Sequence, residues 1–348
     1  MPETRVPAPN AAADALPSVS VVVPTRNGRG RLETCIEALR GASLLADVVV
    51  VVDGPDPETE DVLGRLRAID PRVVPIVIAH SGPSAARTVG VRHASGDVVL
   101  FFDDDIVAAP GLVEGHARHH ARRSGILVVG YTPVPVASAR RPGTFADRLY
   151  AEEYERMCAR YEREPEGILL DLWGAFSLRR SDCDRIGLAS PAFPLRYHED
   201  REFGVRCHKA GLVGVFDRAL VGEHRYSTDP ASFVADARDQ GAGRLLVHRI
   251  HEDVLGPLDA DAFSAGLPPL AGAWVRLTRG RRSHGVAAGL LGVAIRAAGR
   301  LRLFALEMLL ARLLRRVEQQ HGALTMARRT APDAGEAAEN AAAVHSAV

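Results

Sequence analysis

Three consecutive aspartates, Asp103, Asp104 and Asp105, directly follow the apolar run Val98–Phe102. Neighbouring carboxylates repel one another, and each raises the pKa of the others unless a cation lies among them. Carboxylate oxygens are hard ligands that suit Mg²⁺ or Mn²⁺, and such an ion can hold a diphosphate. A solvated acidic turn, or a cap for a helix from Ile106 onward, explains the same residues from composition alone. Their position after a buried strand favours a metal site.

Other titratable residues stand at comparable positions. Asp53 ends a run of valines, where it either hydrogen-bonds a nucleoside or forms the turn before Gly54. Glu199 and Asp200 begin a predicted helix, where the helix dipole favours acidic residues. A carboxylate beside a sugar donor can also take a proton from an attacking nucleophile. A lone histidine such as His224 is usually structural, but near an acidic site it can bind a metal through neutral imidazole.

A scaffold must bring these residues together, and the sequence pattern of the first half of the chain predicts such a scaffold. Short apolar runs alternate with segments of helical periodicity, which indicates a mostly parallel α/β sheet with helices on both faces. Pro75 predicts that the third strand lies near a sheet edge. Ligands of such sheets bind at the carboxyl ends of the strands, so we expect the residues after each strand to form one site. The predicted strands are Val19–Val23, Val48–Val52, Val73–Ile78, Val98–Phe102 and, later, Leu212–Phe216.

Five sequence blocks span roughly residues 18–226. They read VSVVVPTRNGRGRLETCIEAL, VVVVDG, GPSAARTVGVRHASGDVVLFFDDD, WGAFSLRR and HEDREFGVRCHKAGLVGVFDRALVGEH. In this order the blocks resemble the family 2 glycosyltransferases of the GT-A fold, which are inverting and use nucleotide sugars. One Asp-x-Asp motif alone would be weak evidence, whereas five ordered blocks are strong.

The resemblance implies a nucleotide site with Mn²⁺ or Mg²⁺ as the cofactor and a UDP-, GDP- or dTDP-sugar as the donor. Pro24 and Thr25 would border the nucleobase, and Asn27 belongs to the same binding residues. Asp53 would hydrogen-bond the nucleoside, and Arg87 would lie by the nucleotide or the donor sugar.

The resemblance also implies the residues that surround the reacting groups. Asp103 would face the ribose with Asp104 beside it, and Asp105 would bind the metal together with His224. Asp200 matches the catalytic base. The residues implied at the donor sugar and the acceptor are Trp173, Gly174 and Glu199.

The implied reaction is a single displacement that inverts the anomeric carbon. Asp200 would remove a proton from the acceptor while the nucleotide diphosphate leaves, and the metal would neutralise charge on that leaving group. Two residues depart from the family's pattern: Asp53 stands where two acids are common, and Thr88 stands where asparagine is common. Processive members of the family carry a Gln-x-x-Arg-Trp signature, and the stretch from Gln240 to Arg244 does not match it. This mismatch predicts that one sugar or a few are added per acceptor.

Two functions from other classes stay open at this point. A nucleotidyltransferase that makes sugar nucleotides would use a similar sheet, although the Pro-Thr-Arg-Asn-Gly-Arg-Gly-Arg stretch is only a loose match to its glycine-rich loop. A non-catalytic sugar-nucleotide-binding protein is the other alternative. The retained pair Glu199–Asp200 and the acidic triplet argue mildly against it. The identity of the acceptor stays open.

Composition excludes some classes of protein. The chain has 43 basic and 43 acidic side chains and no net charge, which argues against a general nucleic-acid binder. The four cysteines are scattered, which favours a reducing compartment over a disulfide scaffold or a cysteine zinc site. The stretch Ser283–Ile295 is too short to span a bilayer. We therefore expect a cytoplasmic protein, with peripheral contact at the inner face of the membrane as an alternative.

The chain divides into four predicted segments. They are a flexible lead at 1–17, a GT-A catalytic domain at 18–226, a helical region at 227–325 and a disordered tail at 326–348. The catalytic domain combines a Rossmann-like nucleotide-sugar half at 18–130 with an acceptor half at 131–226.

The helical region raises a separate question about partners. A helix from Leu301 would place one apolar stripe between arginines. Packing on the catalytic domain or on a second subunit of a homodimer is the first explanation, and peripheral contact with an anionic membrane is the second. The residues of the predicted stripe are Leu303, Leu306, Leu310, Leu313, Leu314 and Val317.

Overall fold

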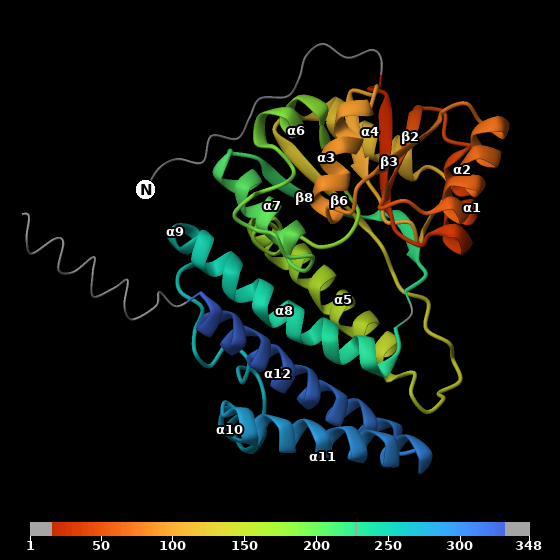
Figure 1. The fold of residues 1–348 in the computed structure, drawn as a ribbon. Helices are drawn as coiled ribbons and strands as arrows, with labels where there is room; N and C mark the ends of the chain where they lie inside the picture. The colour runs from red at the N-terminus through yellow and green to blue at the C-terminus, as the bar shows by residue number, and fades with distance from the viewer. Residues whose placement is uncertain (1–15, 227, 331–348) are drawn as a thin grey trace, which may run out of the picture. The chain divides into compact units, whose positions relative to one another are not determined.

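The computed structural model describes residues 16–226 and 228–330 (Figure 1). These residues divide into two compact units, and the boundary lies between Asp229 and Pro230. Most of the predicted flexible lead, residues 1–15, and most of the predicted tail, residues 331–348, lie outside the described residues. The last helix continues to Arg329, inside the segment for which a disordered tail is predicted.

The first unit begins with the predicted alternation of strands and helices. The strands form where valines cluster, because a strand that is covered on both faces has no polar side to present. In β2, Val49 to Val52 are completely buried. The elements are β1 (Val19–Thr25), α1 (Arg29–Leu39), β2 (Leu45–Asp53), α2 (Pro57–Ile69), β3 (Val73–Ile78), α3 (Pro83–His93) and β4 (Val98–Phe101).

Eight strands form one mixed sheet in the order β3-β2-β1-β4-β7-β6-β8-β5. The neighbours from β3 to β4 are parallel, whereas β7 runs antiparallel to both β4 and β6. β3, which contains Pro75, lies at one end of the sheet, as expected. The strand predicted from Leu212 begins at Val213 but continues to His224, well beyond the predicted end. The remaining strands are β5 (Ile106–Ala108), β6 (Ile126–Tyr131), β7 (Phe176–Arg179) and β8 (Val213–His224).

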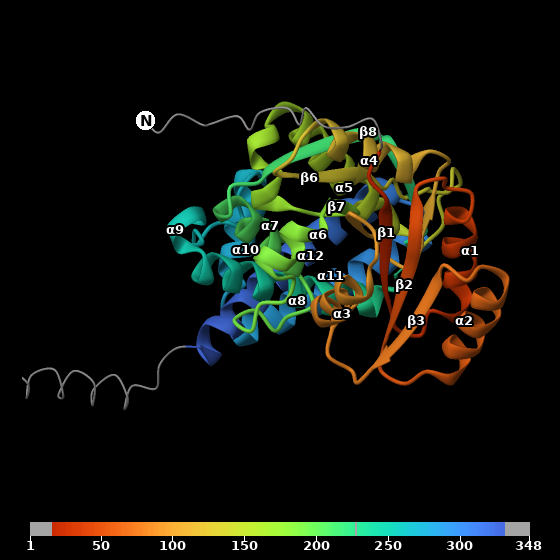
Figure 2. The ribbon, with the colours of Figure 1, turned by 90° about the horizontal axis from the view of Figure 1, so that it is seen from above.

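Helices cover both faces of this sheet. Figure 2 shows α1 and α2 on one side of β1 to β3 and α3 on the other. The two apolar cores that result hold all four cysteines as buried free thiols, Cys35 in one core and Cys158, Cys183 and Cys207 in the other. The other helices of this unit are α4 (Leu112–Arg122), α5 (Phe145–Arg163), α6 (Arg180–Ile186) and α7 (Glu199–Lys209).

The second unit is helical. The two longest helices, α8 and α12, approach so closely that a Cβ atom on Gly241 would stand 1.8 Å from the carbonyl oxygen of Gln319, and one on Gly322 would stand 1.9 Å from that of Arg238. Glycine at these two positions therefore permits the contact. The helices are α8 (Pro230–Ile250), α9 (Glu252–Leu255), α10 (Pro269–Leu277), α11 (Arg281–Arg300) and α12 (Phe304–Arg329).

The leucine stripe predicted from Leu303 to Val317 is wrong in its first half. Leu303 and Leu306 are 50% and 43% exposed, whereas Leu314 and Val317 are buried. The buried face of α12 includes Met308, Ala311 and the polar residue Gln320, because this helix packs against α8, α10 and α11 at once. Among the helices in the described part of the chain, none is long and apolar enough to cross a membrane.

Candidate functional site

Arg87 is a buried cation surrounded by three carboxylates. From α3, its Nη1 donates to Asp200 Oδ1 over 2.9 Å and to Glu199 Oε1 over 3.3 Å. Its Nη2 donates to Asp103 Oδ1 over 3.2 Å. These contacts bring the end of β4 together with the first turn of α7, from opposite halves of the unit. We call Arg87, Asp103, Glu199 and Asp200 the arginine cluster.

Burial and charge shift the pKa values in this cluster. Burial raises the pKa of Glu199, and the neighbouring Asp200 carboxylate raises it further. Burial also raises the pKa of Asp200, although the positive charge of Arg87 opposes that change. Burial works to lower the pKa of Arg87, but the three carboxylates outweigh it, so Arg87 keeps its charge. The cluster is therefore a fixed cation beside two carboxyl groups of increased basicity.

Asp105 and His224 form a second pair, joined by strand pairing. β5 runs antiparallel to β8 with Ile106 opposite His224, which places the two side chains together although they are far apart in sequence. His224 Nε2 lies 3.3 Å from Asp105 Oδ1. Burial works to raise the pKa of Asp105, but the hydrogen bond and the charge of His224, together with the charge of Arg31, outweigh burial, so the pKa lies below the usual aspartate value. Asp105 is therefore ionised at neutral pH.

Aromatic rings surround His224. Tyr150, from α5, places its hydroxyl 3.4 Å from His224 Nδ1 and its ring 4.1 Å from that of Tyr226 in a stacked arrangement. Trp173 meets Tyr150 edge-on at 5.0 Å between ring centroids, and the following Gly174 has a φ of 106°. Burial and the negative charge of Asp103 raise the pKa of Tyr150, so its hydroxyl keeps its proton. The arginine cluster and the pair of Asp105 and His224 are linked through the turn after β4, because Asp103 contacts Arg87 and Asp105 contacts His224.

Asp104 has a different environment from its two neighbours. It is buried and accepts from Thr25 Oγ1 at 2.5 Å and from Arg31 Nε at 2.9 Å. Burial raises the pKa of Asp104, while the hydrogen bonds from Arg31 and Thr25 act in the opposite direction. These contacts tie the acidic turn to β1 and α1, so they fix the direction of the aspartates on either side. Nearby, Pro24 lies within β1, and Asn27 turns the chain with a φ of 54°.

Asp53 organises the loop that follows β3. Its Oδ1 accepts from the backbone of Ser81 at 2.6 Å, and its Oδ2 accepts from that of Gly82 at 3.1 Å. His80 Nδ1 lies 2.8 Å from the same carboxylate, and His80 Nε2 lies 3.1 Å from Arg26. Within the described residues, no hydrogen bond or ion pair joins this group to the arginine cluster. Asp53 therefore lies at the carboxyl end of β2 without direct contact with that cluster.

Sequence reasoning missed several residues at this site. Tyr226 follows His224 by two positions, and that proximity was an available signal. Tyr150 and His80 gave no local signal, because only the packing of α5 and the loop after β3 brings them into place.

Three comparisons relate this chain to known proteins. Residues 20–187 match the family model described as glycosyl transferase family 2. An uncharacterized glycosyltransferase YfnE of Bacillus subtilis is 27% identical over 270 residues, which cover 63% of this chain and 67% of that protein. A glucosyl-dolichyl phosphate glucuronosyltransferase of Haloferax volcanii is 34% identical over 104 residues, which cover 30% of this chain but only 33% of that protein.

Solved structures share the architecture at low sequence identity. The mannosyltransferase PcManGT from Pyrobaculum calidifontis, in complex with GDP-Man and Mn²⁺, superposes with a TM-score of 0.57 at 15% identity, over 90% of this chain and 89% of that one. GalNAc-T7 with UDP, GalNAc and Mn²⁺ gives 0.53 at 16% identity, over 74% and 52%. These likenesses establish the GT-A fold.

Proposed function

Because this chain belongs to glycosyl transferase family 2 and is a glycosyltransferase, we propose that it moves a sugar from a nucleoside diphosphate sugar to an acceptor nucleophile with inversion at the anomeric carbon. The arginine cluster carries this proposal, because it joins the aspartate turn after β4 to a carboxylate pair of increased basicity. The two solved relatives, bound to GDP-Man or to UDP, support a nucleotide-sugar donor.

Asp200 is the proposed general base. Its pKa is raised by burial, which makes it a better proton acceptor than an exposed aspartate. Arg87 contacts Oδ1 of Asp200, which leaves Oδ2 to face an acceptor hydroxyl. The acceptor oxygen would form its bond to the anomeric carbon as the bond to the diphosphate oxygen breaks, and the acceptor proton would go to Asp200. One displacement of this kind inverts the configuration.

The residues present fit a divalent cation held by two protein ligands. Asp105 is ionised and adjoins an imidazole nitrogen of His224, an oxygen and nitrogen pair that Mn²⁺ accepts. No group of three or more histidine, cysteine, aspartate or glutamate side chains could hold a metal in the described part of the chain. A cation here would therefore complete its shell with diphosphate oxygens and water, as Mg²⁺ and Mn²⁺ commonly do. When bound, it would supply positive charge to the leaving diphosphate.

The nucleoside would lie along the edge formed by β1, β2 and the loop after β3. Asp53 holds that loop through the backbone of Ser81 and Gly82, so its effect on the nucleoside would pass partly through the loop. The hydrogen bond from Thr25 to Asp104 fixes the position of this segment, so Pro24 and Asn27 would form a rigid surface beside the nucleobase. Trp173 and Gly174 would border the donor sugar and the acceptor, with Glu199 beside them.

A thermal-shift screen tests the donor, with UDP-, GDP- and dTDP-sugars offered with and without Mn²⁺. We expect one nucleotide class to stabilise the protein only when Mn²⁺ is present. Incubation with that donor should then release the nucleoside diphosphate and, with an acceptor, give a product of inverted configuration. Formation of a nucleotide sugar from a sugar phosphate and a nucleoside triphosphate would contradict the proposal.

A further inference from the structure

The outward side of α11 exposes three apolar side chains. Val286, Leu290 and Val293 are 64%, 65% and 58% exposed. Their spacing of four and three residues places them on one side of the helix. The opposite side of α11 packs against α12 and buries His284, Ala287, Leu291, Ile295 and Ala298. The helix therefore has two apolar sides, and only one of them is covered within the described part of the chain.

Arginines lie at both ends of the exposed strip. Arg282, Arg296 and Arg300 are exposed and, by helical spacing, share its side of α11. The helix contains no aspartate or glutamate. None of these three arginines forms an ion pair with a residue that the structure describes. We name this set of six side chains the α11 outer face: Arg282, Val286, Leu290, Val293, Arg296 and Arg300.

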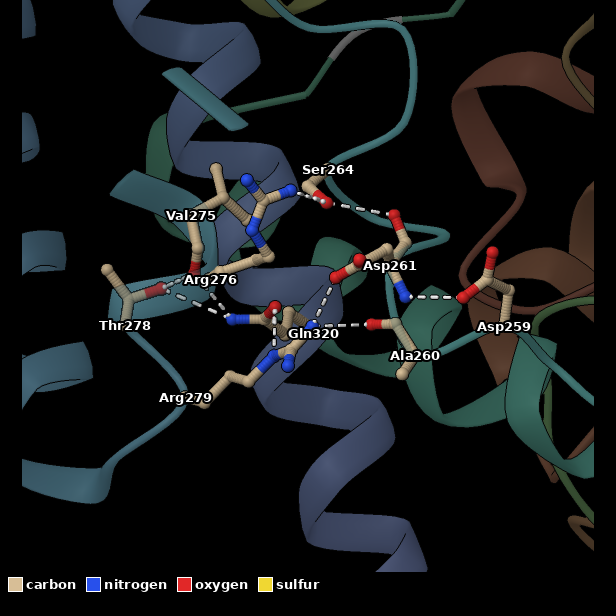
Figure 3. Close-up of polar contacts among 9 residues, drawn as sticks. All are labelled: Asp259, Ala260, Asp261, Ser264, Val275, Arg276, Thr278, Arg279 and Gln320. Atoms are coloured by element: carbon tan, nitrogen blue, oxygen red, sulfur yellow. Dashed lines mark hydrogen bonds and ion pairs between the residues drawn. The ribbon is translucent and has the colours of Figure 1, made fainter. Parts of the chain in front are cut away.

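A buried amide fixes the turn that precedes α11 (Figure 3). Gln320, in α12, donates from Nε2 to the carbonyl oxygen of Val275 over 2.8 Å and to Thr278 Oγ1 over 3.3 Å. Arg279 donates to Gln320 Oε1 over 3.4 Å and to Asp261 Oδ1 over 2.6 Å. These contacts anchor the end of α10 and the residues just before α11 on α12. The α11 outer face is therefore presented by a helix with a fixed position in its unit.

We infer that the α11 outer face docks on an anionic lipid bilayer, with the helix axis parallel to the membrane surface. The apolar strip would enter the boundary between headgroups and acyl chains, while the arginines pair with lipid phosphates. Charge complementarity selects this occupant over a second copy of the chain. Two such faces in contact would bring unpaired arginines against each other, which opposes association.

Co-sedimentation of the full chain with vesicles tests the inference. We expect binding to vesicles of phosphatidylcholine with phosphatidylglycerol, little binding to phosphatidylcholine alone, and release by salt. The triple variant Arg282→Gln, Arg296→Gln, Arg300→Gln should weaken binding by about fivefold for each arginine removed. The triple variant Val286→Ser, Leu290→Ser, Val293→Ser should also lose binding. All six positions are exposed, so both variants should fold, which circular dichroism checks.

A matched control removes three exposed arginines of the first unit, by Arg67→Gln, Arg92→Gln and Arg163→Gln. This control changes the net charge by the same amount as the α11 arginine variant but should bind vesicles like the wild type. Equal losses of binding in the control and in the α11 arginine variant would overturn the inference, as would failure of the wild type to bind anionic vesicles.

Sedimentation velocity without lipid gives a further check. A dimer that only the serine variant dissociates would identify a second copy as the occupant and would also overturn the inference. Vesicle binding requires neither donor nor metal, so its failure would leave the proposed sugar transfer untouched.

Discussion

The guanidinium of Arg87 donates to the carboxylate of Asp200 over 2.9 Å, and both side chains are largely buried. The proposed base is therefore held by a counter-ion that α3 supplies, while Asp200 itself belongs to α7. Burial raises the pKa of Asp200 and Arg87 lowers it, so the basicity of the carboxylate depends on the balance between the two. The same guanidinium also holds Asp103, which couples the base to the aspartate turn.

Replacement of Asp200 by asparagine tests the role of this carboxylate. Asp200→Asn keeps the size of the side chain but cannot take up a proton. We expect the transfer rate to fall by about 10²- to 10⁴-fold, with the donor affinity changed by less than about twofold. Single-turnover kinetics and calorimetry measure the two quantities. Asp184→Asn, on the exposed side of α6, is the matched control. Near-normal transfer by Asp200→Asn would rule out the base assignment.

Glu199 should make the stability of the protein depend on pH. Burial and the charge of Asp200 raise its pKa in the folded state. A carboxyl group with a raised folded pKa adds stability below its unfolded pKa and loses that contribution as pH rises through the folded value. Glu199→Gln mimics the protonated form, so it should melt at least about 2 °C above the wild type near pH 9 and together with it near about pH 4.5.

The melting temperatures of the wild type, Glu199→Gln and a control variant are measured at both pH values. Glu58→Gln is the control, because that glutamate is 69% exposed and should have little effect at either pH. A lower melting temperature for Glu199→Gln near pH 9 would show that the charged form of Glu199 stabilises the fold.

Asp105 should determine how Mn²⁺ affects donor binding. In the wild type, we expect Mn²⁺ to increase the donor affinity, and Asp105→Ala should abolish that increase by removing an ionised oxygen ligand. Titration of donor with and without Mn²⁺ measures the difference. Asp217→Asn is the control, because Asp217 lies on β8, the strand that contains His224, and likewise pairs with a histidine, His119 Nε2, at 2.7 Å. An unchanged Mn²⁺ effect in Asp105→Ala would remove Asp105 from the ligand set.

Tyr150 should position the ring of His224. Its hydroxyl lies beside Nδ1, and partners of this kind orient metal-binding histidines. Tyr150→Phe keeps the stacked ring but loses the hydroxyl, so we expect Mn²⁺ affinity to fall by about tenfold. Electron paramagnetic resonance of free Mn²⁺ gives the affinity without any assay of transfer. Tyr161→Phe is the control, since that hydroxyl donates to the backbone of Asp171. Equal affinity in Tyr150→Phe and the wild type would refute the positioning role.

The part of the fold from β1 to β4 was predictable because β1, β2 and β4 are buried on both faces. A run such as Val48–Val52 has no polar alternation and is typical of a covered parallel strand. The second half was harder to predict. The middle of β8, around Asp217 and Arg218, is half-buried and charged, so its length exceeded the predicted Leu212–Phe216. The predicted stripe in α12 failed because a helix with neighbours on several sides has no single apolar face.

The candidate site shows the same division between local and long-range information. The acidic triplet could be found from residue types and the expected sheet edge, and the resemblance to the family pointed to the pair Glu199–Asp200 at the start of a helix. The resemblance also named Arg87, but its contact with Asp200 could not be predicted, because the two residues lie 113 positions apart. The different environment of Asp104, held by Thr25 and Arg31, likewise depends on how α1 packs against the aspartate turn.

The four buried thiols can report when the first unit unfolds. Cys35, Cys158, Cys183 and Cys207 all belong to that unit, and the sequence contains no other cysteine. A thiol reagent should therefore react only when one of the two cores around the sheet opens. The helical unit is silent to the same reagent, so a single cysteine introduced there would report its opening separately. The natural cysteines thus follow the opening of the first unit in the intact chain, and an introduced cysteine would follow that of the helical unit.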